Sequence, residues 1–127
     1  MRIVLADDER DFVDVLAERL SLRGHAVRVA PDGAAALAAL AEAPSDILVL
    51  DWFMPGLSGP EVLTRVAQSS PGLPVVLLSG HSRLDEEAFP AQVCAVLTKP
   101  LRFDAFLEIL EDAAKGQRQT EGESHEP

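Results

Sequence analysis

The chain has 127 residues, 47% of them hydrophobic and 25% charged, which is typical of one globular domain with a single core. Its formal net charge of −10 argues against a surface that tracks nucleic-acid phosphates, and no apolar run is long enough to span a bilayer. Because acidic residues interrupt the first apolar stretch at Asp7, the sequence predicts a cytoplasmic protein without a secretory leader, a membrane partner or a direct nucleic-acid partner.

The first part of the chain predicts a strand, a helix and a second strand. The strand covers residues 3–6, and the helix covers residues 9–23 and stops at Gly24. Apolar residues are expected on one face of this helix: Phe12, Val15, Leu16 and Leu20. Residues 26–30 follow as an edge strand, because Arg28 breaks their apolar run.

The middle of the chain repeats this alternation. An alanine-rich helix is predicted within residues 31–44. Residues 47–50 are all apolar, as expected for a strand covered on both faces, and they lead straight into Asp51. Ser58 and Glu61 have the spacing of a capping box, which predicts that a third helix begins there.

The last part predicts two more strands and two more helices. Strands are expected over residues 75–78 and 93–97, with Cys94 as a buried thiol in the second. A short helix is expected over residues 84–89, and a longer amphipathic helix over residues 103–115.

Five β–α units in series predict an α/β fold with one parallel sheet and helices on both of its faces. No internal repeat or second domain is found, so residues 1–116 are expected to form the domain. Residues 117–127 contain no apolar residue and are expected to be a disordered tail.

Polar residues stand at the ends of four predicted strands. Asp7 and Asp8 follow the first, Asp51 the third, Ser79 the fourth and Lys99 the fifth. In an open parallel sheet these ends meet at one edge, where ligands bind. Two unit charges about 4 Å apart repel by about 4 kcal/mol at an effective dielectric near 20, so converging carboxylates require a raised pKa or a bound cation. Hard oxygen ligands favour Mg²⁺, and the whole set is typical of phosphoryl transfer.

With these motifs in order, residues 2–115 resemble a receiver domain of a two-component response regulator, the family of the chemotaxis regulator. The resemblance implies a flavodoxin-like (βα)5 fold with strand order 2-1-3-4-5. The segments that carry it are IVLADDE over 3–9, GHAV over 24–27, APDG over 30–33, DWFMPG over 51–56, SGH over 79–81 and KP over 99–100.

The resemblance implies that Asp51 is the phosphoacceptor of a phosphorelay and that the reaction depends on Mg²⁺, with Mn²⁺ as an alternative ion. Asp8 and Asp51 would bind the ion directly and Asp7 through a water molecule. The backbone carbonyl of Phe53 would supply a further oxygen. The domain would catalyse its own phosphorylation and dephosphorylation without being a turnover enzyme.

The resemblance also implies roles for the remaining strand-end residues. Ser79 would donate a hydrogen bond to the phosphoryl group, and Lys99 would pair with it across a cis bond to Pro100. The phosphoryl donor would be a histidine kinase or a histidine phosphotransfer protein. The phosphorylated domain would then bind an unknown downstream protein or a second copy of itself in a phosphorylation-dependent homodimer. His81 is expected near the mouth of the site, where it tunes water access or is an incidental surface residue.

One position and one spacing depart from the family pattern. The switch position three residues before the lysine, usually aromatic, is Val96. The spacing between Ser79 and Lys99 is shorter than usual, and Pro90 interrupts the segment between them. Two consequences are open: phosphorylation is read out differently from other family members, or the signal is carried by order and disorder in residues 80–92.

Two other functions compete with this interpretation. One is a constitutive interaction module that is never phosphorylated. The other is a small Mg²⁺-dependent phosphohydrolase with Asp51 as nucleophile, although the second acid that such chemistry usually requires is replaced by Phe53. The sequence also leaves open whether the chain is a whole regulator or part of a longer one.

Overall fold

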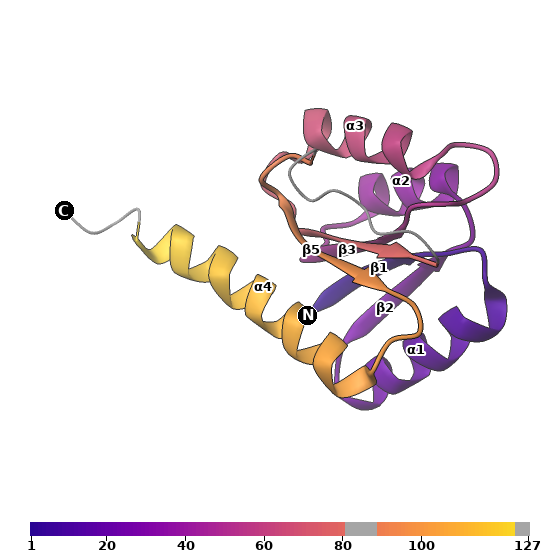
Figure 1. Ribbon diagram of the computed structural model, residues 1–127. Helices are drawn as coiled ribbons and strands as arrows, with labels where there is room; N and C mark the ends of the chain where they lie inside the picture. Colours follow the sequence, from indigo (N-terminus) through magenta and orange to yellow (C-terminus); the bar gives the residue numbers. More distant parts are fainter. Residues whose placement is uncertain (81–88, 124–127) are drawn as a thin grey trace.

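The protein folds as one five-stranded parallel sheet in the order β2-β1-β3-β4-β5 (Figure 1). The computed structural model describes residues 1–80 and 89–123, with side chains to residue 115 in the last helix. The sheet and its strand order confirm the predicted fold class. The strands are β1 (Arg2–Ala6), β2 (Ala26–Ala30), β3 (Ile47–Asp51), β4 (Val75–Ser79) and β5 (Val93–Thr98).

Helices cover both faces of the sheet. Figure 1 shows α2 and α3 on one face and α1 and α4 on the other. Each face has its own apolar cluster, one built with α2 and α3 and the other with α1 and α4. Every residue of β3 is buried, as predicted for a strand covered on both sides, and every residue of β4 is buried as well. The helices are α1 (Arg10–Leu22), α2 (Gly33–Glu42), α3 (Gly59–Ser69) and α4 (Phe103–Glu123).

Local side-chain contacts fix where α2 and α3 begin. The Asp32 side chain accepts a hydrogen bond from the backbone N–H of Ala35 at the start of α2. The predicted capping box is present at the start of α3, where Ser58 and Glu61 satisfy each other's backbone N–H groups. Asp32 lies in the loop after β2 and Ser58 in the loop after β3, so the two caps help to fix the loops that follow these strands.

The edge strand β2 carries the arginine that breaks its apolar run. Arg28 donates hydrogen bonds to the backbone carbonyls of Ala39 and Ala43 and to the Ser45 hydroxyl. These carbonyls lie at the C-terminal end of α2, where backbone acceptors lack partners within the helix. Arg28 therefore ties the end of α2 to the sheet edge.

Two expectations about burial are wrong. In α1 Val15 is 53% exposed and Val13 is buried, because the stripe of the helix that packs on the sheet passes through Val13, Leu16 and Leu20. Cys94 is exposed and not buried. Its strand β5 is an edge strand, and the register shifts there so that Val75 pairs with Val93 and Val76 with Ala95. Cys94 is thus the extra residue of a bulge.

The last helix extends further than expected. Its backbone continues to Glu123, past the predicted boundary at residue 116, because residues 117–123 include glutamine, arginine and glutamate and no proline. The division of the chain at residue 116 stays a prediction. The helix predicted over 84–89 and most of the 80–92 segment lie outside the described residues. Within the described part, no helix has the length and apolar character to cross a membrane.

Candidate functional site

The strand-end residues meet at one edge of the sheet. Asp7 directly follows β1, and Asp51 and Ser79 end β3 and β4. Asp7 and Asp51 are only 1% and 4% exposed, whereas Asp8 is exposed. One carboxylate oxygen from each of the three aspartates lies within 4.8 Å of the others. The structure thus brings together the three aspartates that the sequence singled out.

Backbone hydrogen bonds continue the sheet beyond its strands and hold these residues in place. The N–H of Asp7 donates to the Ala30 carbonyl at 3.0 Å. On the other side, the N–H of Lys99 donates to the Ser79 carbonyl at 2.8 Å. Because the backbone is fixed on both sides, the short aspartate side chains have little freedom to move apart.

The Lys99 ammonium lies inside the acidic cluster. Its Nζ atom is 2.8 Å from Asp7 Oδ2, 2.7 Å from Glu9 Oε1 and 3.7 Å from Asp51 Oδ2. The Lys99 side chain is 10% exposed, so its interactions are poorly screened by solvent. The Lys99–Pro100 bond is cis, as the resemblance implied.

Negative charge exceeds positive charge in this cluster. Burial, followed by the charge of Asp7, raises the pKa of Asp51 to about 6, although Lys99 partly opposes this. Burial on its own would lower the pKa of Lys99, but the close contacts of its ammonium with the Asp7 and Glu9 carboxylates outweigh burial and raise that pKa. Four carboxylates surround one ammonium, a formal excess of three negative charges. Such a site favours a further cation.

The donor set fits a hard divalent ion. Asp7 Oδ2 is buried and makes no hydrogen bond of good geometry; its close partner is the Lys99 ammonium. An ion bound by Asp7, Asp8 and Asp51 would have carboxylate oxygens as protein ligands, and the exposed Asp8 leaves room for water. Mg²⁺ suits such a set because it keeps several waters and takes few protein carboxylates.

The other predicted site residues lie at varied positions. Ser79 is fully buried at the end of β4. Phe53 has an exposed side chain, and its backbone N–H donates to Asp51 Oδ1 at 3.4 Å. Val96 is half-buried, pairs with Leu77 in the sheet and packs on the α2–α3 side of the core. His81 lies outside the described residues.

Sequence reasoning missed the part of Glu9 in this site. Its carboxylate is the second partner of Lys99, and its backbone N–H donates to Asp7 Oδ1 at 2.9 Å. An acidic residue directly after the aspartate pair was the available signal. It was indistinguishable from a residue that only favours a helix N-terminus.

Comparison with known proteins gives a consistent set of relatives. The transcriptional regulatory protein GlrR of Escherichia coli K12 is 29% identical over 113 residues, which are 87% of this chain and 26% of that protein. The response regulator MprA of Mycobacterium avium is 34% identical over 109 residues, 84% of this chain and 48% of that protein. The chain therefore spans a quarter to a half of the length of these curated relatives.

Solved structures agree with the fold. The response regulator TrrA of Thermotoga maritima, determined in complex with Mg²⁺ and BeF, has a TM-score of 0.80 at 27% identity and covers 88% of this chain and 97% of that one. A CheY-like receiver domain protein from Methanospirillum hungatei has a TM-score of 0.87 at 23% identity, covers 94% of this chain and 97% of that one, and shows the fold alone.

The family assignment follows from a match over most of the chain. The response regulator receiver domain matches residues 3–111, which include β1 except its first residue, β2 to β5 and the predicted site residues from Asp7 to Lys99. The strand order of the sheet agrees with this match. The chain therefore belongs to the response regulator receiver domain family, the receiving part of two-component signalling systems.

Proposed function

We propose that this domain accepts a phosphoryl group on Asp51 in a reaction that depends on Mg²⁺, with Mn²⁺ as an alternative. The observation that supports it is the juxtaposition of three aspartates within 4.8 Å with Lys99 at 3.7 Å from Asp51. Receiver domains of response regulators take phosphoryl groups from histidine kinases, and the donor here would be a phosphohistidine of a kinase or of a phosphotransfer protein.

The proposed reaction is a displacement at phosphorus. A carboxylate oxygen of Asp51 forms the new P–O bond, the P–N bond of the phosphohistidine breaks, and the imidazole, which carries a proton on its other ring nitrogen, leaves as a neutral group. When bound by Asp7, Asp8 and Asp51, the metal would neutralise the charge on the transferring oxygens. Lys99 would pair with one phosphoryl oxygen, and Ser79 would donate a hydrogen bond to another.

Phosphorylation would act as a switch by favouring one of two conformations. A bound group can shift such an equilibrium only by its difference in affinity for the two states. Ser79 is the last residue of β4 and Lys99 directly follows β5, so contact with a common phosphoryl group would stabilise one relative placement of these strand ends. The altered state would bind a downstream protein or a second copy of the domain with changed affinity.

The experiment uses the tryptophan next to Asp51 as its reporter. Trp52 is half-buried, and its ring packs edge-on against Phe89 with centroids 5.1 Å apart. We expect its fluorescence to respond to Mg²⁺ and then to beryllofluoride, a phosphoryl mimic. Asp51→Asn should abolish the second response and also labelling by a small acyl phosphate. The surface variant Asp112→Asn serves as the matched control and should retain both.

The rival functions predict different results. If the wild type responds to neither reagent and is not labelled, it is an interaction module that works without phosphorylation. If it turns over a phosphomonoester repeatedly, with release of inorganic phosphate that Asp51→Asn abolishes, it is a phosphohydrolase. Either result would contradict the proposed function.

A further inference from the structure

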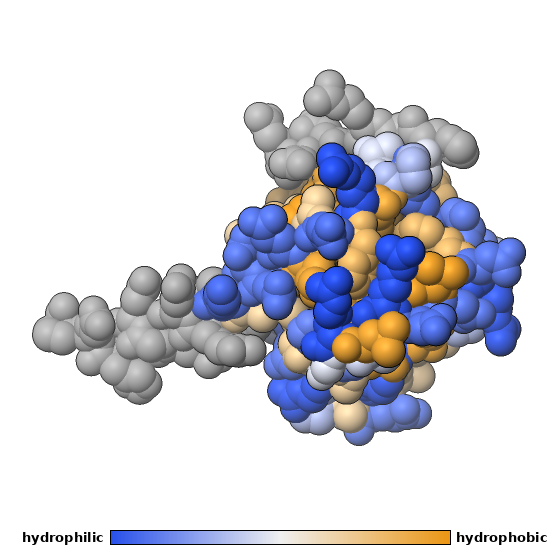
Figure 2. Space-filling view, turned by 90° about the horizontal axis from the view of Figure 1, so that it is seen from below, coloured by the Kyte–Doolittle hydropathy of each residue, from blue (hydrophilic) through white to orange (hydrophobic). Residues whose placement is uncertain are grey.

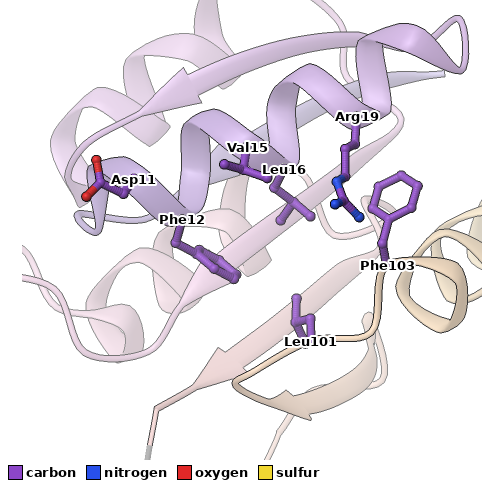
Figure 3. A pocket seen from close by; sticks show the side chains of 7 residues that line it. All are labelled: Asp11, Phe12, Val15, Leu16, Arg19, Leu101 and Phe103. Carbon is purple, nitrogen blue, oxygen red and sulfur yellow. The ribbon is translucent and has the colours of Figure 1, made fainter.

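Phe12 of α1 contacts the site and also lines an apolar groove beside it. The Lys99 ammonium lies over the Phe12 ring, with Nζ 4.6 Å from the ring centroid. Figure 3 shows the same ring at one end of a groove of about 400 Å³ between α1 and the segment that follows β5. The apolar residues that line this groove with Phe12 are Val15, Leu16, Leu101 and Phe103.

The Lys99 ammonium has alternative positions besides the one over the Phe12 ring. Lysine carries its charge on a flexible four-carbon stem, which is costly to hold in one conformation. One of its carboxylate partners, Glu9, is itself 59% exposed and could draw the ammonium outward. A cation within about 6 Å of an aromatic centroid is attracted to the ring face, more strongly where water is excluded. Phe12 therefore opposes an outward movement of Lys99.

We propose that Phe12 is a positioning residue for Lys99. Its ring holds the ammonium beside the three aspartates, within reach of Asp51, so that it meets an incoming phosphoryl group without a conformational search. The inference rests on the proposed function of Asp51, and it adds to the site a residue from α1 that would act through Lys99.

Phe103 provides a matched control in the same groove. It is also aromatic and lines the groove with Phe12, but it lies beside Arg19 (Figure 3). Its ring faces two arginines, with the guanidinium carbons of Arg19 and Arg23 at 5.6 and 5.4 Å from its centroid. Replacing either ring by leucine removes a comparable apolar surface from the groove. Only the replacement at Phe12 should affect Lys99.

The first measurement is made on the metal-free protein and needs no phosphoryl chemistry. Lys99 and Lys115 are the two lysines of the chain, so their side-chain NMR signals are simple to assign, and Lys115 is an internal reference. We expect nuclear Overhauser effects between the Lys99 ε-protons and the Phe12 ring in the wild type. Phe12→Leu should move the Lys99 signals downfield as the ring current is lost, while Phe12→Tyr and Phe103→Leu should leave them in place.

The second measurement tests the role in the site. At saturating Mg²⁺, Phe12→Leu should weaken beryllofluoride binding by roughly three- to tenfold, as Trp52 fluorescence reports. Its affinity for Mg²⁺ alone should stay within about twofold of the wild type, since the ion contacts the carboxylates and not the lysine. Phe12→Tyr, which keeps an aromatic ring face, should restore beryllofluoride binding, and Phe103→Leu should not alter it.

Several results would overturn the proposal. They are the absence of the Overhauser effects in the wild type, Lys99 signals that do not move in Phe12→Leu, and an equal loss of beryllofluoride affinity in Phe103→Leu. A wild type that gives no beryllofluoride response would instead defeat the proposed function and with it the role of Phe12. The metal-free spectra distinguish a failure of the role of Phe12 from a failure of the proposed function, because they need no phosphoryl chemistry. The Overhauser measurement on the wild type does not depend on whether a variant folds.

Discussion

Asp51 is the candidate nucleophile, and its surroundings set its pKa. It is almost fully buried beside Asp7, and burial together with that negative charge raises its pKa to about 6. An aspartate in an unfolded chain has a pKa of about 3.9. The folded, metal-free domain therefore binds this proton more tightly than the unfolded chain does between these two values.

This difference predicts how stability depends on pH. Because the native state holds more protons between pH of about 4 and 6, the free energy of unfolding of the metal-free domain should fall as pH rises through that window. The loss attributable to Asp51 is at most about 3 kcal/mol. Urea unfolding in a chelator at a series of pH values would measure it.

Asp51→Asn is the variant that isolates this effect. It should lack the Asp51 contribution to the pH dependence and be more stable than the wild type at pH 7 in chelator, because a neutral amide replaces a buried charge beside Asp7. Added Mg²⁺ should narrow the difference, since an ion stabilises the wild-type carboxylate. Parallel pH curves for the two proteins would contradict the raised pKa.

At the scale of single elements, α3 begins against the backbone of the segment that leaves Asp51. Gly59 is the first residue of α3 and is buried. A Cβ atom at this position would lie 2.6 Å from the Trp52 carbonyl oxygen and 2.8 Å from its Cα. The absence of a side chain at Gly59 thus lets the helix approach the residue next to the phosphoacceptor candidate.

Gly59→Ala should therefore destabilise the fold and disturb the neighbouring site. The clash is with backbone atoms that cannot rotate away, and we expect a loss of roughly 1–3 kcal/mol in the free energy of unfolding and an altered Trp52 emission. Gly72→Ala is the control, because a Cβ atom there meets nothing within 4 Å and should change stability by less than about 0.5 kcal/mol. Equal unfolding midpoints in urea for the two variants would contradict the close approach.

At the scale of the whole molecule, α4 closes one face of the sheet with only part of its length. Its buried side chains include Phe106, Leu107, Leu110 and Ala114. Figure 2 shows this face of the molecule, with hydrophobic surface between hydrophilic residues; the exposed apolar residues of α1 include Val15 and Leu22. The sequence has no apolar residue after 116, although the helical backbone continues to Glu123.

Truncation tests where the domain ends. A chain that stops at Gly116 should unfold at a urea concentration close to that of the full chain, with a difference in stability below about 0.5 kcal/mol. Phe106→Ala, which removes a side chain that is 1% exposed from the core, should cost roughly 3–5 kcal/mol. A truncated chain as unstable as Phe106→Ala would show that residues 117–127 belong to the folded domain.

Much of this architecture could be predicted because it follows from local rules. Alternating apolar runs and helical periodicity indicate parallel strands with crossover helices, and strands that end together bring Asp7, Asp51 and Lys99 to one edge. What could not be predicted depends on tertiary detail. The bulge that exposes Cys94 arises from a register shift between neighbouring strands, and the pairing of Lys99 with Glu9 depends on side-chain conformations.

The 2.8 Å contact between Lys99 and Asp7 also implies an order of events. The ammonium compensates only one of the negative charges gathered here, so, on the proposed function, a phosphoryl donor that is itself an anion would meet a net negative site in the metal-free domain. A divalent ion held by the three aspartates would offset two more of those charges while Lys99 stays beside Asp7. The order that we propose is therefore ion first and phosphoryl donor second, with the Lys99 ammonium, 3.7 Å from Asp51, available to the donor.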